Sequence, residues 1–213
     1  MKQPMIVGKA ALVVVDIQQA AAMPAELVGI THMEGLDGRV ERAEQLVTAA
    51  REAGLPIVFF QEVHRPSGID FGRELDGAEG RHCVAGAPGT DLWPTLVPDP
   101  TADDREFHLV KRRYSGFIGT EFEIVLRGLG VQTLILIGGL TDVCVHLTFA
   151  DAHQRDYYVR VVEDCVGGSS LAAHEAALNA MEYLQTGARR TTAEVVGAFA
   201  GLGSTRVLQG VGA

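Results

Sequence analysis

The chain lacks the features that mark several classes of protein. Its three cysteines are an odd number without a framework spacing, so we expect no disulfides and a reducing, cytoplasmic location. The early apolar run at residues 10–15 ends in Asp16 and is too short for a membrane span or an export signal. Internal repeats and low-complexity tracts are missing as well. We therefore expect a single domain over residues 1–213.

Positive charge is scarce. Lys and Arg number 18 against 27 Asp and Glu, which gives a formal net charge of -9. This balance argues against a nucleic-acid surface, so the expected partner is a small-molecule substrate, with no nucleic acid and no membrane. With 47% hydrophobic residues, the chain can nevertheless bury a substantial core.

The chain is rich in apolar strand patterns that alternate with helical ones. Strands are expected at residues 10–15, 57–60, 107–110, 131–137, 157–162 and 192–196. Apolar residues at helical spacing lie between them, for example from 37 to 53 and from 118 to 129. The alternation predicts an α/β fold, a single-domain, doubly wound, Rossmann-like and mainly parallel sheet of about six strands with helices on both faces.

The stretch LILIGGLTDVCVHLT, which begins at Leu134, organises this expected fold. Its first four residues are apolar, as a strand buried on both faces must be, and two glycines at 138–139 end the strand. A helical pattern begins near Thr141, so Cys144 should lie in or beside the first helical turn. The helix macrodipole there would lower the pKa of the thiol and favour a reactive thiolate. The alternative is a buried cysteine that acts as a small hydrophobic residue.

Three side chains with useful chemistry follow three different strands. Asp16 ends the first strand, Lys111 ends the third, and Cys144 follows the fourth. Open α/β sheets bind ligands in the crevice beyond the carboxyl ends of their strands, so we expect the three side chains in that crevice. Taken alone, Asp16 would more commonly cap a turn, and Lys111 would more commonly be a surface residue.

Three motifs around these residues resemble those of the isochorismatase-like cysteine hydrolases. They are ALVVVDIQ with Asp16, KRRYSGFIGTEFEIVLRGLG opening on Lys111, and GGLTDVCV with Cys144. Their order and spacing match the family over most of residues 10–170. This superfamily includes nicotinamidases, N-carbamoylsarcosine amidase, biuret hydrolase and ureidoacrylate amidohydrolase.

The resemblance implies a catalytic triad of Asp16, Lys111 and Cys144 that hydrolyses a carbon–nitrogen bond without a cofactor. Asp16 would take the thiol proton, and the sulfur would attack an amide or carbamoyl carbon to form a thioester that water then hydrolyses. A cis peptide bond between Gly139 and Leu140 is also implied, with the backbone N–H groups of Leu140 and Cys144 as the oxyanion hole. Relatives commonly form dimers or tetramers, so a homo-oligomer is expected.

Departures from the family bear on the substrate. Ala20–Ala22 stand where nicotinamidases usually place an aromatic residue, and the Asp-Trp-His metal segment of those enzymes is missing. Isochorismatases proper cleave a vinyl ether and commonly lack the cysteine. The expected substrate is therefore a small amide, carbamoyl, ureido or lactam compound. Gln18, His64, Tyr114 and Phe117 are candidate substrate-binding residues, although each also has an ordinary structural explanation.

A metal site is a weaker alternative. Glu62 and His64 have the acidic-x-His spacing of a metal site in nicotinamidase-like relatives. A metal needs at least a third protein ligand, and no motif ties His32 or His82 to this pair. We therefore expect no metal, and a metal-assisted, nicotinamidase-like hydrolase stays an alternative function.

The remaining features leave further alternatives open. The segment 65–104 is long and aperiodic, which is typical of a functional loop such as a lid. Cys83 and Cys165 are expected to be structural thiols. A catalytically idle, oligomeric binding or scaffold protein of the same fold is the competing function, and an intact triad counts against it.

Overall fold

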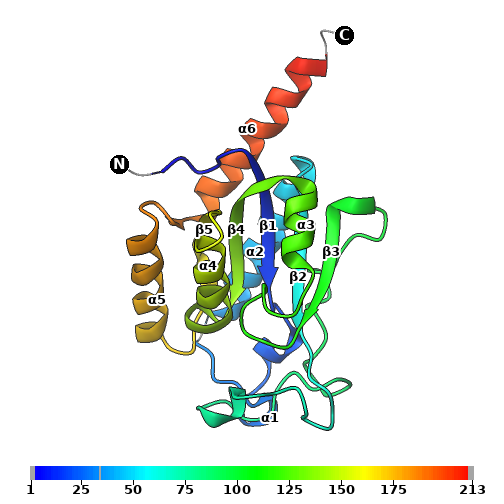
Figure 1. Ribbon diagram of the computed structural model, residues 1–213, viewed down its shortest axis with the longest axis vertical. Helices are drawn as coiled ribbons and strands as arrows, with labels where there is room; N and C mark the ends of the chain where they lie inside the picture. The colour runs from blue at the N-terminus through cyan, green and yellow to red at the C-terminus, as the bar shows by residue number, and fades with distance from the viewer. Residues whose placement is uncertain (1–2, 34, 211–213) are drawn as a thin grey trace.

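Six parallel strands form one sheet in the order β3-β2-β1-β4-β5-β6 (Figure 1). The computed structural model describes residues 3–33 and 35–210. The strands are β1 (Lys9–Val15), β2 (Ile57–Glu62), β3 (Glu106–Lys111), β4 (Val131–Gly139), β5 (Tyr158–Gly167) and β6 (Arg189–Arg190). The predicted parallel α/β sheet of about six strands is confirmed.

Helices cover both faces of this sheet, as predicted. They are α1 (Ala25–Val28), α2 (Leu36–Glu52), α3 (Phe122–Leu129), α4 (His146–His153), α5 (Leu171–Leu184) and α6 (Thr192–Gly210). One core cluster joins α3, α4 and α5 to one face, and a second joins α2 and α6 to the other. Alternate residues of β1 enter the two clusters, Val13 the first and Val14 the second. A strand buried on both faces must be apolar throughout, which explains its continuous hydrophobic run.

The strand order fixes where a ligand can bind. β1 and β4 are neighbours at the centre of the sheet, and the chain proceeds outward from them in opposite directions. Such a switch point opens a crevice beyond the carboxyl ends of the two strands. Asp16 directly follows β1, and the turn containing Cys144 directly follows β4, so both residues lie at this crevice.

The prediction of a strand at 192–196 is wrong, because these residues begin α6. Thr191 and Glu194 form a capping box: Glu194 Oε2 accepts from the Thr191 backbone N–H at 2.9 Å, and Thr191 Oγ1 accepts from the Glu194 N–H at 3.3 Å. The last strand, β6, contains two residues only. The β-branched residues after the cap suggest a strand, but the cap and burial of Val195 against the sheet select a helix.

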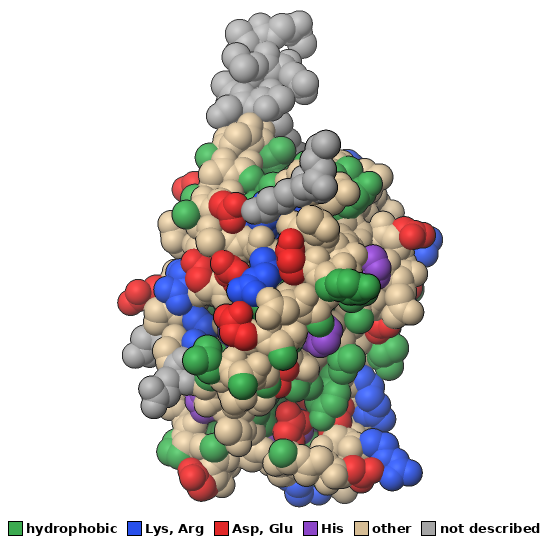
Figure 2. Space-filling view, turned by 90° about the vertical axis from the view of Figure 1, so that its left-hand side faces the viewer, with side chains coloured by type: hydrophobic (Ala, Val, Ile, Leu, Met, Phe, Trp, Pro, Cys, Tyr) green, Lys and Arg blue, Asp and Glu red, His purple; other side chains and the backbone are tan. Residues whose placement is uncertain are grey.

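Other boundaries shift by a few residues. β5 continues to Gly167, beyond the predicted end at 162, and α3 begins at Phe122. None of the helices among the described residues is long and apolar enough to cross a membrane. On the side of the molecule seen in Figure 2, acidic and basic side chains are intermixed. Among the surface ion pairs of the chain, Arg189 pairs with Glu163 at 2.7 Å and with Glu175 at 3.2 Å.

Candidate active site

Lys111 connects the other two members of the predicted triad. Its Nζ lies 2.8 Å from Oδ2 of Asp16 and 3.3 Å from Sγ of Cys144. The Lys111 side chain is 0% exposed and that of Asp16 is 10% exposed. Three segments that are far apart in the sequence therefore meet at the carboxyl edge of the sheet, where the sequence places them.

Glu62 is a second carboxylate beside the same ammonium group. Its Oε2 lies 2.5 Å from Nζ of Lys111 and 3.7 Å from Sγ of Cys144. The sequence alone does not indicate this contact. It arises because β2 and β3 are parallel neighbours in which Glu62 is in register with Lys111. The site thus contains one ammonium group against two carboxylates and a thiol.

This imbalance of charge sets the protonation states. Burial, together with the charge of Glu62, outweighs the attraction of Lys111 and raises the pKa of Asp16 to about 6. Burial also raises the pKa of Cys144 well above its ordinary value; Asp16 and Glu62 add to this effect and Lys111 opposes it. Although burial opposes its charged form, Lys111 is held by Asp16, Cys144 and Glu62 at a pKa well above the ordinary value.

The predicted lowering of the thiol pKa is therefore wrong. It assumed that the positive end of a helix dominates at Cys144, but the residue is buried beside two carboxylates. In addition, Cys144 lies in a π-helical turn, Thr141–Val145, whereas α4 begins only at His146. At neutral pH the resting sulfur carries its proton.

The turn that carries Cys144 is held firmly on both sides. The peptide bond between Gly139 and Leu140 is cis. Thr141 Oγ1 lies 2.9 Å from Nδ1 of the buried His174 on α5. Gly138 has a φ of +111°, and a Cβ at this position would lie 2.0 Å from the carbonyl oxygen of Val15. Only glycine fits this close approach of β4 to β1. Gly138 therefore sets the path of the chain into the turn that carries Cys144.

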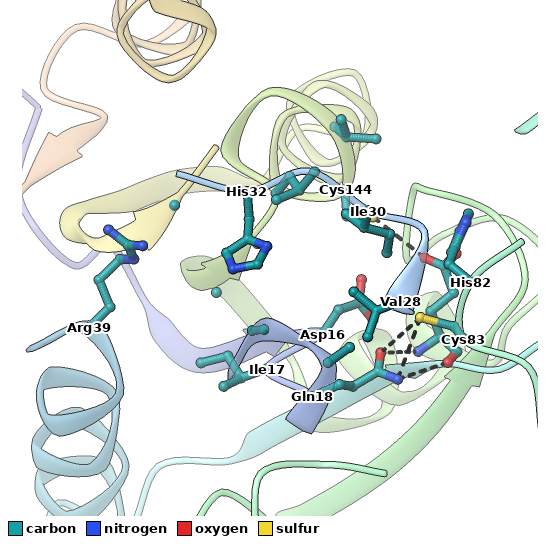
Figure 3. Close-up of a pocket in the computed structure, with 18 of the residues that line it drawn as sticks. Asp16, Ile17, Gln18, Val28, Ile30, His32, Arg39, His82, Cys83 and Cys144 are labelled. Atoms are coloured by element: carbon teal, nitrogen blue, oxygen red, sulfur yellow. Dashed lines mark hydrogen bonds and ion pairs between the residues drawn. The ribbon is translucent and has the colours of Figure 1, made fainter. Parts of the chain in front are cut away.

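A largely apolar pocket opens beside the triad (Figure 3). Asp16, Cys144, Gly139 and Leu140 line it at the carboxyl edge of β1 and β4. Its empty space, including the open mouth, is about 930 Å³. A concave, mostly apolar lining with a few polar groups is typical of a site for a small molecule.

Gln18 lines this pocket, but its amide is already used. Its Nε2 donates to the carbonyl oxygen of Glu62 at 3.1 Å, and its Oε1 accepts from the backbone N–H of Glu62 at 3.0 Å. Nε2 also donates to the carbonyl oxygen of Thr90. The side chain is 3% exposed. Gln18 therefore connects β2 to the long loop at the wall of the pocket, and its role as a substrate contact stays a prediction.

The other three predicted binding residues lie in different surroundings: one lines the pocket, one lies in the core, and one contacts buried acidic residues. Tyr114 lines the pocket and donates its hydroxyl to Oε2 of Glu79 at 2.9 Å. Phe117 is a core residue that packs on Phe122, with ring centroids 4.8 Å apart, and it is not part of the pocket lining. His64 is 0% exposed and is occupied by buried acidic neighbours.

Cys83 and Cys165 both line the pocket; the Cys83 sulfur lies 3.7 Å from Nε2 of Gln18, and the Cys165 sulfur lies 3.6 Å from the carbonyl oxygen of Arg39. Burial raises the pKa of Cys83 well above its ordinary range and that of Cys165 to about 12. Neither thiol is paired in a disulfide. Both thus stay protonated at neutral pH, as expected of structural cysteines.

A buried group of two glutamates and two histidines adjoins the triad through Glu62. His82 Nε2 lies 2.9 Å and His64 Nε2 lies 3.1 Å from Oε1 of Glu62, and His64 Nε2 lies 3.0 Å from Oε2 of Glu74. One ligand atom from each of the four residues lies within 4.8 Å of the others. Although burial opposes it, hydrogen bonds to Glu62 and Glu74 raise the pKa of His64 to about 9.

These four side chains fit a divalent metal ion, which the sequence does not predict. Two imidazole nitrogens and two carboxylate oxygens are a suitable donor set for a transition metal. Among the described residues, the buried Oε1 of Glu74 has no hydrogen-bond partner, and Oε2 faces the Nε2 atoms of His64 and His82 at 3.0 and 3.9 Å. The third and fourth ligands, Glu74 and His82, come from the loop 65–104, whose aperiodic sequence gives no sign of where it folds.

Comparison with known proteins identifies the family. A model of the isochorismatase domain matches residues 10–195. Ureidoacrylate amidohydrolase RutB of Pseudomonas syringae pv. syringae (strain B728a) is 30% identical over 195 residues, which covers 81% of this chain and 77% of that protein.

Solved structures agree. A cysteine hydrolase from Pseudomonas syringae pv. phaseolicola 1448A has a TM-score of 0.75 at 26% identity, covering 95% of this chain and 100% of that one. N-carbamoylsarcosine amidase from Thermoplasma acidophilum has a TM-score of 0.68 at 28% identity, covering 87% of this chain and 97% of that one. The chain belongs to the isochorismatase domain family.

Proposed function

We propose that the protein is a cysteine amidohydrolase that cleaves a carbon–nitrogen bond of a small amide, carbamoyl, ureido or lactam compound. The observation that carries this proposal is the position of the Lys111 ammonium group, 2.8 Å from the Asp16 carboxylate and 3.3 Å from the Cys144 sulfur, beside a pocket. Two similar proteins, a ureidoacrylate amidohydrolase and an N-carbamoylsarcosine amidase, support a reaction at a carbon–nitrogen bond.

Asp16 moves the protons in this mechanism. The Cys144 sulfur attacks the carbonyl carbon while Asp16 takes the thiol proton, so the total charge of the buried site does not change. Asp16 then gives that proton to the leaving nitrogen, the carbon–nitrogen bond breaks, and a thioester remains. Water attacks the thioester as Asp16 takes its proton; the carbon–sulfur bond breaks and the proton returns to sulfur. Lys111 keeps Asp16 in place and favours its charged form.

The oxygen of each tetrahedral intermediate needs fixed hydrogen-bond donors. The backbone N–H groups of Leu140 and Cys144 are our assignment for this oxyanion hole. Support comes from their position, because both residues line the pocket on the turn that presents the sulfur. Removal of one such donor typically lowers turnover about a hundredfold or more.

A panel of small amides, ureido acids, carbamoyl compounds and lactams tests the proposal, with release of ammonia or acid as the readout. At least one class should be hydrolysed, with iodoacetamide blocking the reaction and substrate protecting Cys144 from alkylation. Ala20 and Ala21 line the pocket, which supports a substrate other than a flat aromatic ring clamped by an aromatic side chain. No turnover on any compound, together with alkylation of Cys144 that none of the compounds slows, would favour the idle scaffold instead.

The rate should depend on pH through Asp16. This carboxyl has a pKa of about 6 and must be ionised to accept the thiol proton. We expect kcat/KM to be constant near neutral pH and to fall about tenfold for each pH unit below about 6. A pH profile of the hydrolysed substrate measures this directly. A profile that stays flat down to the ordinary pKa of an aspartate would contradict the assignment.

A metal-assisted hydrolase is the second candidate, favoured by the group of Glu62, His64, Glu74 and His82. These four residues would hold the ion. When bound, a divalent ion supplies Lewis acidity that polarises a carbonyl oxygen.

Added zinc is therefore expected to raise the Tm of metal-free protein by about 5 °C or more, because it binds only the folded chain. His82→Gln should abolish the shift, and His146→Gln, which changes a half-buried histidine outside the group, should keep it. If zinc changes the Tm of wild type and of His82→Gln by the same amount, the four residues form a network of charged hydrogen bonds and not a metal site. The cysteine amidohydrolase would then be the remaining candidate.

A further inference from the structure

Arg39 is a basic residue of the pocket that the proposed mechanism does not use. It lies in the second turn of α2 and lines the same pocket as Asp16 and Cys144. Figure 3 shows it apart from those two residues, with His32 between them. The pocket therefore extends from the reacting sulfur to a guanidinium group.

The position of the guanidinium group is fixed by its surroundings. Its Nη2 donates to the carbonyl oxygen of Met33 at 2.9 Å. A Cβ added to Gly167 would lie 2.8 Å from Nε of Arg39, and one added to Gly35 would lie 3.2 Å from Nη1. Two glycines thus leave room for the group against the carboxyl end of β5, and one hydrogen bond orients it.

Arg39 has no anionic partner within 4.0 Å among the side chains that the structure describes, although other arginines of the chain do. Arg51, for comparison, lies on the same helix and pairs with Glu106 at 2.8 Å. The charged neighbour that acts on Arg39 is another cation, Arg42, and burial with this repulsion lowers the pKa of Arg39. A partly buried cation without a counter-ion is costly, so the site favours an anionic ligand.

The distribution of charge along the pocket shows which part of a ligand would lie at Arg39 and which part at Cys144. Asp16, Glu62 and Glu79 line the end near the sulfur and would repel an anion. Apolar residues, among them Ile17 and Val28, line the wall as well. A ligand with an uncharged amide at one end and an anion at the other is therefore oriented with its amide at Cys144.

We propose that Arg39 binds a carboxylate of the substrate, so that the enzyme acts on amide, carbamoyl or ureido compounds that carry an acid group remote from the scissile bond. This inference rests on the proposed function and names its substrate class. The two parallel N–H groups of a guanidinium match the two oxygens of a carboxylate. A dianionic phosphate would leave excess negative charge in a pocket that already contains three carboxylates.

A binding experiment that needs no turnover tests this. In a Cys144→Ala background, β-ureidopropionate and its methyl ester are compared by calorimetry. The acid should bind about tenfold to a hundredfold more tightly than the ester, as a charge-assisted hydrogen-bonded pair does. Adding Arg39→Gln should remove the preference, and Arg39→Lys should restore part of it. Arg42→Gln is the matched control, since it removes the same charge one turn away without touching the pocket, and it should keep most of the preference.

Kinetics of the enzyme with Cys144 intact separate this inference from the proposed function. Arg39→Gln should raise KM for the acid by about tenfold or more and leave kcat nearly unchanged, because the contact is equal in ground and transition states. A clear binding preference for the acid without any turnover would remove the proposed hydrolysis and keep the anion site. Equal binding of acid and ester, or no binding of either, would overturn the role of Arg39.

Discussion

Cys144→Ala is expected to lower kcat about a thousandfold or more while the fold remains intact. The sulfur forms the covalent intermediate of the proposed mechanism, so its loss removes the reaction path and not merely a contact. Turnover on the best substrate of the panel is the measurement, with a thermal scan to verify folding.

Cys165→Ala is the matched control for this change. It removes a buried thiol of the pocket wall whose hydrogen bond goes to the carbonyl oxygen of Arg39, so KM can change while kcat should stay within about threefold. Substantial turnover by Cys144→Ala would mean that the sulfur is not the nucleophile, and attention would move to water activated at the group of Glu62, His64, Glu74 and His82.

Lys111→Met is expected to remove turnover and to destabilise the protein by about 3–5 kcal/mol. The ammonium group lies 2.8 Å from Asp16 and 2.5 Å from Glu62, and its side chain is 0% exposed. Methionine fills a similar volume, but it leaves the buried Asp16 without its counter-charge and leaves Glu62 with only His64 and His82 as partners. Unfolding in urea measures the change in the free energy of unfolding.

Two variants sharpen this measurement. Lys9→Met replaces an exposed lysine and should change stability by no more than about 0.5 kcal/mol. Adding Glu62→Gln to Lys111→Met should recover part of the lost stability, because one of the unpaired charges is removed. A Lys111→Met protein as stable as wild type would show that the ion pairs of Lys111 do not stabilise the buried carboxylates.

The sheet and the meeting of Asp16, Lys111 and Cys144 could be predicted because their signals are local. β1 and β4 are continuous apolar runs that end in distinctive residues, and the motifs around Asp16, Lys111 and Cys144 place those residues at strand ends. The order of the strands then brings the ends together. Hydrophobic periodicity and the three motifs are therefore sufficient to predict the central strands and the positions of Asp16, Lys111 and Cys144 at strand ends.

The other features of the site depend on contacts between residues far apart in the chain, which the sequence alone does not reveal. Glu74 and His82 come from an aperiodic loop, and only its folded path brings them to His64. Arg39 lies on a regular helix, but nothing in the helical pattern shows that it faces a pocket without a counter-ion. The prediction of a lowered pKa for Cys144 was wrong for the same reason. The sequence indicates a helix start near the thiol, but it does not show that Cys144 is buried beside Glu62.

Quenching the reaction with acid during turnover, followed by peptide mass spectrometry, tests the central claim most directly. The account predicts that the peptide containing Cys144 carries the acyl part of the substrate, bound to sulfur and released by hydroxylamine, and that Cys83 and Cys165 stay unmodified. Full turnover with no acylated Cys144 at any time point, or an acyl group on a different residue, would contradict it.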